Sequence, residues 1–202
     1  MLGVDPDSGQ VLGLGDFEAF LRTSREGGKK SKDWRGTLEG DAWKHAAQAG
    51  GPAPEGLVWV HGADREGDNF EFWATCRVLN AHFLARIQCH RRYWVREEGK
   101  EKASLMDYAR SLEAQAGNRF ELEVPACPGR WARRARLQVA WGKVGVGPSA
   151  QAPREIRQNR PFVAWVLRVW EPNPPEGVEA IEWVLLTSLP VSTHAQAWEK
   201  IE

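Results

Sequence analysis

The chain has 202 residues, which is enough for one domain, with or without an insertion, and for a sizeable core. Its 27 basic and 27 acidic residues exclude a strong overall field of either sign, so binding to nucleic acid or membrane would have to rest on local charge. The sequence has three cysteines without CxxC spacing, no N-terminal signal and no apolar run of about 18 residues. We therefore expect a cytoplasmic protein that does not enter a membrane.

The first fifty residues predict a hairpin, a loop and a helix. Leu2–Val4 and Val11–Leu14 flank Asp5-Pro-Asp-Ser-Gly9, whose residue types favour a tight turn. Residues 22–35 are polar and contain Gly27-Gly-Lys-Lys, which indicates a solvated basic loop that could also touch phosphate. Thr37–Ala49 carries an apolar stripe, begins with a capping residue and is followed by Gly50-Gly-Pro, so we expect a helix there.

The next segment predicts a strand, a turn, a helix and a second strand. The apolar run Leu57–Val60 predicts the first strand, and a carboxylate-rich turn follows at residues 64–68. We expect a helix over 67–79 with Asp68 as its cap and with Phe70, Trp73, Ala74 and Val78 on its buried face. Asn80 ends that helix and residues 81–87 (AHFLARI) predict a strand, so the two strands should be parallel with a right-handed crossover.

The second half predicts one more helix and a series of strands. Residues 103–116 have helical periodicity, and after Gly117 the apolar residues alternate with polar ones. We expect strands near 120–124, 134–141, 161–170 and 181–188, separated by joints rich in Gly and Pro at 125–128, 142–153 and 171–177. The sequence therefore predicts an α+β fold in which an α/β unit carries a mostly antiparallel sheet.

Asp64 is the candidate catalytic residue and metal ligand. It follows the strand of a predicted parallel pair, and in open α/β sheets ligands bind beyond the carboxyl ends of the strands. A carboxylate in that place suits Mg²⁺, which proteins hold with one or two carboxylates together with water and substrate phosphates. One aspartate does not make a metal site. The alternative is that Asp64 and Asp68 only cap the helix, with Arg65 and Glu66 paired in solvent.

A basic and aromatic segment could bind nucleic acid near that turn. Arg86 lies near the end of the second strand, and His90, Arg91, Arg92, Tyr93, Trp94 and Arg96 follow it. Arginine binds phosphate with two hydrogen bonds, and Tyr93 or Trp94 could stack on an unpaired base. A solvated run of charge is the alternative interpretation.

Residues 60–72 (VHGADREGDNFEF) resemble the second-aspartate motif of bacterial DDE transposases of the insertion-sequence four group, in which a strand ends in Asp-Arg-Glu-Gly/Ala-Asp. The resemblance continues through AHFLARI, FELEVPACPGRWARRARLQV and EPNPPEGVEAIEWVLLTSLPV, and GVDPDSGQVLGL resembles the hairpin after the family's first catalytic aspartate. It thus covers nearly the whole chain. It implies a partial RNase H-like core at 1–117, a β-rich insertion at 118–190 and the start of a C-terminal helix at 191–202.

The resemblance also implies an activity and site residues. The family carries out cut-and-paste DNA transposition by phosphoryl transfer, with two Mg²⁺ held by Asp, Asp and Glu, and Asp64 matches the second Asp. Arg86 matches an arginine near the cleaved strand, and Trp183 matches a tryptophan that stacks on an extruded base. A core role is the alternative for Trp183. With Arg65, His90, Arg91 and Arg92, these two residues are the predicted DNA contacts.

The expected partners are transposon-end DNA and either a second copy or a complementing transposase chain. The family's first Asp belongs upstream of the opening hairpin, and its Glu belongs to a Tyr-Arg-Glu helix downstream, which Glu199 and Glu202 do not match. Asn69 also departs from the apolar residue usual after the motif. We therefore expect a transposase fragment that binds Mg²⁺ weakly or not at all and is inactive alone, or a non-catalytic DNA-binding or interaction module derived from one.

Overall fold

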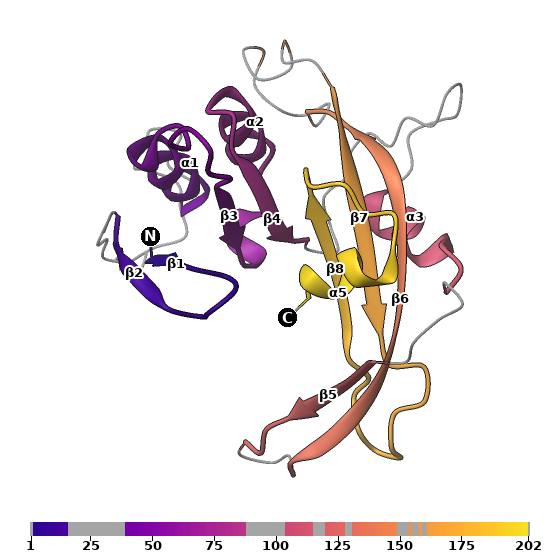
Figure 1. Cartoon of the computed structure of the whole chain (residues 1–202). Helices are drawn as coiled ribbons and strands as arrows, with labels where there is room; N and C mark the ends of the chain where they lie inside the picture. Colours follow the sequence, from indigo (N-terminus) through magenta and orange to yellow (C-terminus); the bar gives the residue numbers. More distant parts are fainter. Residues whose placement is uncertain are drawn as a thin grey trace, which may run out of the picture.

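The computed structural model describes residues 2–15, 39–87, 104–114, 120–127, 131–148, 154, 158 and 161–201. These residues form four α-helices, a six-stranded mixed sheet and a separate two-stranded sheet (Figure 1). The strand order of the large sheet is β3-β4-β8-β7-β6-β5. The expected combination of helices with a mixed, mostly antiparallel sheet is therefore confirmed.

The predicted N-terminal hairpin is present. Strands β1 (Leu2–Val4) and β2 (Val11–Leu14) pair antiparallel. The carboxylate of Asp5 accepts hydrogen bonds from the Asp7 N–H at 3.1 Å and the Ser8 hydroxyl at 2.6 Å, and Gly9 has a φ of +68°. These are the roles that the turn residues predict, because a short polar side chain replaces backbone partners and glycine tolerates positive φ.

Helix α1 (Glu39–Gly50) is followed by Gly51, whose φ is +67°, so it ends where the Gly-Gly-Pro sequence predicts. The predicted cap Thr37 and the loop at 22–35 lie outside the described residues. Ala47 is fully buried, and Trp43 packs against the same core. Helix α1 contacts the next helix and the turn that precedes it, so it supports that turn from the side.

Strand β3 (Val60–Ala63) and strand β4 (His82–Arg86) are parallel, as predicted, with register partners from Val60↔His82 to Ala63↔Ala85. The predicted start of β3 is wrong. Leu57 and Val58, with 61% and 68% of their surface exposed, precede the strand, because pairing with β4 begins only at Val60. An apolar run indicates a strand but does not define which residues find a partner.

The 3₁₀ turn η1 (Arg65–Gly67) and helix α2 (Phe70–Val78) connect these strands. The predicted face of α2 is partly wrong: Val78 is 86% exposed, and Phe72 and Cys76 are buried with Phe70 and Trp73. The helix end agrees with prediction, since Asn80 has a φ of +54°. The N–H groups of Asn80 and Ala81 donate to the carbonyls of Arg77 and Cys76, which is the Schellman arrangement.

The remaining strands are β5 (Phe120–Val124), β6 (Arg133–Val146), β7 (Phe162–Trp170) and β8 (Glu182–Thr187). The predicted joint beginning at Gly142 is wrong, because β6 pairs with β7 as far as Val146↔Phe162. Packing explains why residue 142 is a glycine, because a Cβ there would lie 2.6 Å from the hydroxyl oxygen of Tyr108. Strand β8 pairs with β4 as well as β7, so the two predicted parts of the fold share one sheet.

The two faces of the sheet bury different clusters. Phe162, Ala164 and Val166 of β7 belong to the core under α2 and α3 (Leu105–Ser111), which we call the α2 face. Leu167 and Val169 belong to the cluster under α5 (His194–Glu199), which we call the α5 face. The alternation follows from the two-residue period of a strand. Helix α3 is shorter than the predicted 103–116 within the residues described.

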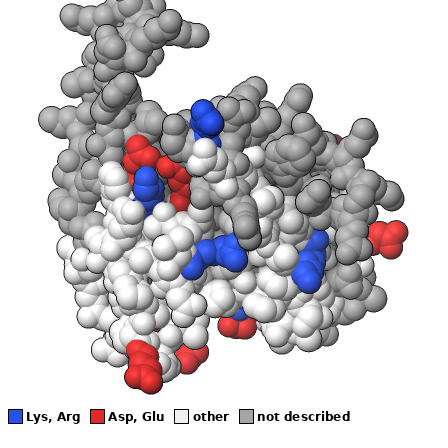
Figure 2. All heavy atoms as spheres, turned by 90° about the horizontal axis from the view of Figure 1, so that it is seen from above, with Lys and Arg blue, Asp and Glu red and all other residues white. Residues whose placement is uncertain are grey.

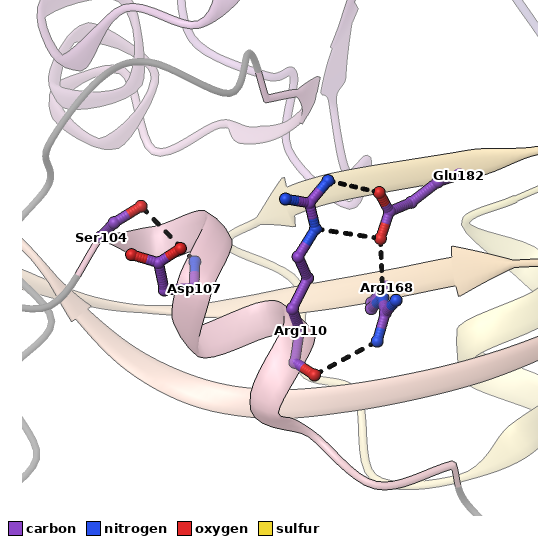
Figure 3. Close-up of polar contacts among 5 residues, drawn as sticks. All are labelled: Ser104, Asp107, Arg110, Arg168 and Glu182. Atoms are coloured by element: carbon purple, nitrogen blue, oxygen red, sulfur yellow. Dashed lines mark hydrogen bonds and ion pairs between the residues drawn. The ribbon is translucent and has the colours of Figure 1, made fainter.

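An ionic network fixes α3 to the sheet (Figure 3). Arg110 of α3 donates two hydrogen bonds to the carboxylate of Glu182 in β8, the Nε–Oε1 bond being 3.2 Å long. Arg168 of β7 donates from Nε to Glu182 at 2.9 Å and from Nη1 to the carbonyl of Arg110 at 3.2 Å. Arg110, and secondarily Arg168, lower the pKa of the Glu182 carboxyl. The network therefore holds three elements together while the carboxylate is ionised.

None of the helices in the described part of the chain has the length and apolar character needed to cross a membrane.

Candidate functional site

Asp64 lies immediately after β3 and begins the turn η1. Its backbone is extended, with φ −76° and ψ −162°, and its Oδ1 accepts a hydrogen bond from the Glu66 N–H at 3.0 Å. The side chain is exposed, and Oδ2 has no hydrogen bond to any residue that the structure describes. Asp64 thus caps the 3₁₀ turn and not helix α2, so the alternative interpretation, in which it caps the helix, is wrong on this point. Its exposed side chain still presents a carboxylate oxygen to solvent.

The turn that carries Asp64 is tightly fixed to the core. A Cβ added at Gly67 would lie 2.2 Å from the Cβ of Ala63, so no larger residue fits there without movement. The indole N–H of Trp73 donates to the Gly67 carbonyl at 3.0 Å, and Trp73 is fully buried. Because α2 holds the turn through this bond, the position of Asp64 relative to β3 is well defined.

The predicted capping role of Asp68 is wrong for α2. Asn69 is the N-cap, and its Oδ1 accepts a hydrogen bond from the Glu71 N–H at 2.9 Å. Asp68 instead follows η1 as the C-cap of that turn, with 1% of its surface exposed. Because of the 3₁₀ turn, the helix begins at Phe70 and not at the predicted residue 67, and its cap is Asn69 and not Asp68. The departure of Asn69 from the apolar residue usual in the resembled motif therefore has a local structural role.

Arg86 lies beside Asp64 at the ends of the parallel strands. Ala63 and Ala85 are register partners, and Asp64 and Arg86 each follow that pair by one residue. Adjacent strands lie about 4.8 Å apart, so the two backbones are neighbours at this edge. The strand alternation places Arg86 on the α5 face, and the extended backbone of Asp64 continues the same alternation.

Trp183 contacts Arg86. Its indole ring lies under the guanidinium group, with 5.9 Å between Cζ of Arg86 and the ring centroid. Trp183 belongs to β8, which pairs with β4, and it packs on the cluster under α5 while remaining half-buried. Trp183 therefore packs in the core and also contacts an arginine that is predicted to bind DNA.

A Ser–His contact near these strands was not identified in the sequence. Ser188 Oγ lies 3.0 Å from Nδ1 of His82 and accepts a hydrogen bond from the Phe83 N–H at 3.1 Å. Burial lowers the pKa of His82, and the nearby charge of Lys200 lowers it further. Burial also lowers the pKa of His61, whose Nε2 is buried without a hydrogen-bond partner in the described structure. Only the pairing of β4 with the end of β8 reveals the first contact, so no local sequence signal could have found it.

The described residues fit a magnesium ion only in part. Asp64 offers an oxygen ligand of the kind Mg²⁺ prefers. No group of three His, Cys, Asp or Glu side chains suited to a metal is found within the residues described. The site as described therefore supplies one ligand, and no metal-dependent step is derived from it.

The other predicted DNA contacts are only partly placed. Arg65 is exposed in η1, whereas His90, Arg91 and Arg92 lie outside the described residues. In Figure 2, which shows the molecule from above, the described Lys and Arg side chains are separated by other residues, and one lies beside a group of acidic side chains. On that face, the described residues do not form a continuous basic patch.

Comparison with known proteins does not assign a family. No protein-family model matches the sequence, and no curated protein matches it significantly.

Proposed function

We propose that the chain is part of a DNA-binding protein of the DDE transposase type, with an RNase H-like core, in which Asp64 supplies one carboxylate of a magnesium site. The supporting observation is the placement of Asp64 and Arg86 at adjacent ends of the parallel strands. Trp183 supports the same proposal, because the guanidinium group of Arg86 lies over its ring. A carboxylate can hold a metal ion, a guanidinium group can bind phosphate and an indole can stack on a base, so each of the three groups can serve a site that acts on a DNA strand.

Each of the three side chains has a defined task in this proposal. Arg86 binds a phosphate of the strand, since a guanidinium group matches two phosphate oxygens. Trp183 offers its exposed part to a base, and stacking tolerates any base because each has a π-face. Asp64 holds a carboxylate beside that phosphate on a turn that Trp73 fixes to the core. A bound Mg²⁺ would supply Lewis-acid chemistry and lower the pKa of coordinated water.

A second function, a DNA-binding module without catalysis, is favoured by one observation. Asp64 is not part of a three-residue metal group within the described part of the chain. At least one further ligand of such a group would therefore have to come from outside the residues described. In this second function, the chain binds DNA and does not cleave it alone.

The test is DNA binding by the full chain, measured by fluorescence anisotropy at several salt concentrations. Arg86→Ala should weaken binding and reduce the slope of log K against log[salt] by about 0.9 for duplex DNA or about 0.7 for a single strand. Arg154→Ala is the control, because Arg154 is an exposed arginine on a different segment of the chain. Equal binding by Arg86→Ala and wild type at every salt concentration would overturn the proposed site.

The effect of Mg²⁺ on DNA binding distinguishes the transposase function from the non-catalytic DNA-binding module. Mg²⁺ should strengthen DNA binding by the wild type, and Asp64→Asn should remove that effect. Asp107→Asn, which changes an exposed aspartate on α3, should retain it. If Mg²⁺ has no effect on the wild type, the non-catalytic module is supported. Nicking of DNA that disappears in Asp64→Ala would contradict the statement that the chain does not cleave alone.

A further inference from the structure

Trp131 is the most exposed large hydrophobic side chain in the described structure, with 90% of its surface in solvent. It lies in the connection between β5 and β6. Every other described tryptophan is buried or half-buried. Tryptophan is enriched among the residues that dominate binding energy, because it buries a large rigid surface on contact. The sequence gives no local reason for leaving this side chain in solvent.

The two strands that flank Trp131 pair antiparallel through residues 120–124 of β5 and 133–137 of β6, and these residues form an arm at the lower end of the molecule in Figure 1. Two cross-strand ion pairs, each 3.1 Å long, join Arg134 to Glu123 and Arg136 to Glu121. On the other side of the arm, Phe120 stacks on Trp198 of α5, with 4.1 Å between ring centroids. The arm is thus fixed to the body of the protein.

A half-buried ion pair fixes the chain next to Trp131. Arg133, two residues further on, donates hydrogen bonds from both terminal nitrogens to the two carboxylate oxygens of Glu171. The two side chains are 13% and 3% exposed, and Arg133 lowers the pKa of Glu171. Ile181 donates its N–H to the same carboxylate at 3.4 Å. A ligand of Trp131 would therefore meet a backbone that is already ordered, which reduces the entropy cost of binding.

The charge around Trp131 indicates the class of ligand. The segment 129–136 reads GRWARRAR, in a chain whose net charge is zero. The described strands of the arm carry three of these arginines, and each of the three pairs with a glutamate: Arg133 with Glu171, Arg134 with Glu123 and Arg136 with Glu121. The side chains of Arg134 and Arg136 are 71% and 70% exposed, so they remain accessible to phosphate. An exposed aromatic ring among arginines is the combination that binds single-stranded nucleic acid, through stacking and phosphate contacts.

We propose that Trp131 stacks on an unpaired base of DNA and that the arm is a second contact, separate from the Asp64 site. This inference rests on the proposed DNA-binding function. Strands β8 and β7 lie between β4 and β6, so the arm contacts a part of the DNA about 14 Å or more from Arg86. A protein partner would instead be expected to match the apolar ring with apolar neighbours, whereas the exposed side chains of the two flanking strands are charged: Glu121, Glu123, Arg134 and Arg136.

The test compares a labelled single strand with a labelled duplex of the same sequence, each titrated with the full chain. Trp131→Ala should weaken single-strand binding about 5- to 150-fold, the loss expected for one stacked base. It should change duplex binding much less, and Trp131→Phe should retain most of the single-strand affinity. Val78→Ala is the control, because Val78 is 86% exposed on a different element.

The outcomes separate this proposal from the function on which it rests. If Arg86→Ala weakens DNA binding and Trp131→Ala does not, the stacking proposal is wrong and the proposed function remains. If the wild type binds neither DNA, both are wrong. If Trp131→Ala leaves DNA affinity unchanged but converts an oligomer to a monomer in sedimentation, Trp131 binds a second copy of the chain and the stacking proposal is wrong.

Discussion

The guanidinium group of Arg86 lies over the indole ring of Trp183, although the two residues are almost one hundred positions apart in the chain. The contact exists because β4 and β8 pair antiparallel, with Arg86 opposite Leu185. A cation above an aromatic ring is attracted by the negative face of the ring. The contact therefore couples the parallel strand pair, which carries Asp64, to the antiparallel part of the sheet.

We predict a favourable coupling energy between Arg86 and Trp183 of about 0.5–1 kcal/mol. A double-mutant cycle with Arg86→Ala and Trp183→Leu, measured by chemical denaturation, gives this value. Arg168 and Trp170 provide a comparison pair in the same sheet, with Cζ 4.4 Å from the ring centroid, and should show a larger coupling. Additive effects of Arg86→Ala and Trp183→Leu would contradict the prediction.

Gly67→Ala should destabilise the turn that carries Asp64. The new Cβ would lie 2.2 Å from the Cβ of Ala63, and overpacking of this kind costs about 1–3 kcal/mol. Gly62→Ala is the control, because no atom lies within 4 Å of a Cβ at that position. The free energy of unfolding from urea titration measures both effects.

The clash also predicts a rescue. Ala63→Gly in the background of Gly67→Ala removes the atom that the new Cβ meets, so the double variant should be more stable than Gly67→Ala alone. Part of the loss should remain, because glycine within a strand costs about 0.5–1 kcal/mol. A double variant no more stable than Gly67→Ala would show that the Ala63 contact is not the cause.

Asn69→Ala should cost about 1 kcal/mol, since the Glu71 N–H at the start of α2 would lose its acceptor. Asn69→Asp should retain the stability or raise it slightly, because aspartate keeps the acceptor and adds a negative charge at the helix N-terminus. Thermal unfolding at neutral pH distinguishes the two variants. Equal destabilisation by both substitutions would contradict the capping role of Asn69.

Much of the local structure around Asp64 could be predicted because its causes are local. The order strand, helix, strand predicts parallel pairing of β3 and β4, and Asn80 marks the end of α2. The cap was misplaced by one residue, because nothing in the sequence distinguishes a direct strand-to-helix connection from one with a 3₁₀ turn. Asp68 and Asn69 are both good caps, and only the backbone path decides between them.

Contacts between distant segments could not be predicted in the same way. Gly142 looks like a joint in the sequence, but it lies within β6 because that strand pairs with β7 on both sides of it, and Tyr108 of α3 packs against it. The contact of Arg86 with Trp183 and that of His82 with Ser188 depend on the pairing of β4 with β8. Pairing between strands so far apart is set by the whole core, and a pattern within one segment does not contain it.

Stability should fall as the pH drops below about 6.5, because the pKa values of His61 and His82 are both lowered in the folded protein. Below that pH the unfolded chain binds more protons than the folded protein. The contribution of the two neutral histidines to the free energy of unfolding is therefore complete above their pKa in the unfolded chain, and it is lost as the pH falls towards their pKa in the folded protein. Linkage limits this loss to about 1.4 kcal/mol per pH unit for each histidine. Thermal unfolding at pH 7.5 and 5.5 measures the loss.

His82→Asn should reduce the dependence of stability on pH, since no side chain at that position then becomes charged in the partly buried site beside Lys200. An equal pH dependence in His82→Asn and the wild type would contradict the assignment.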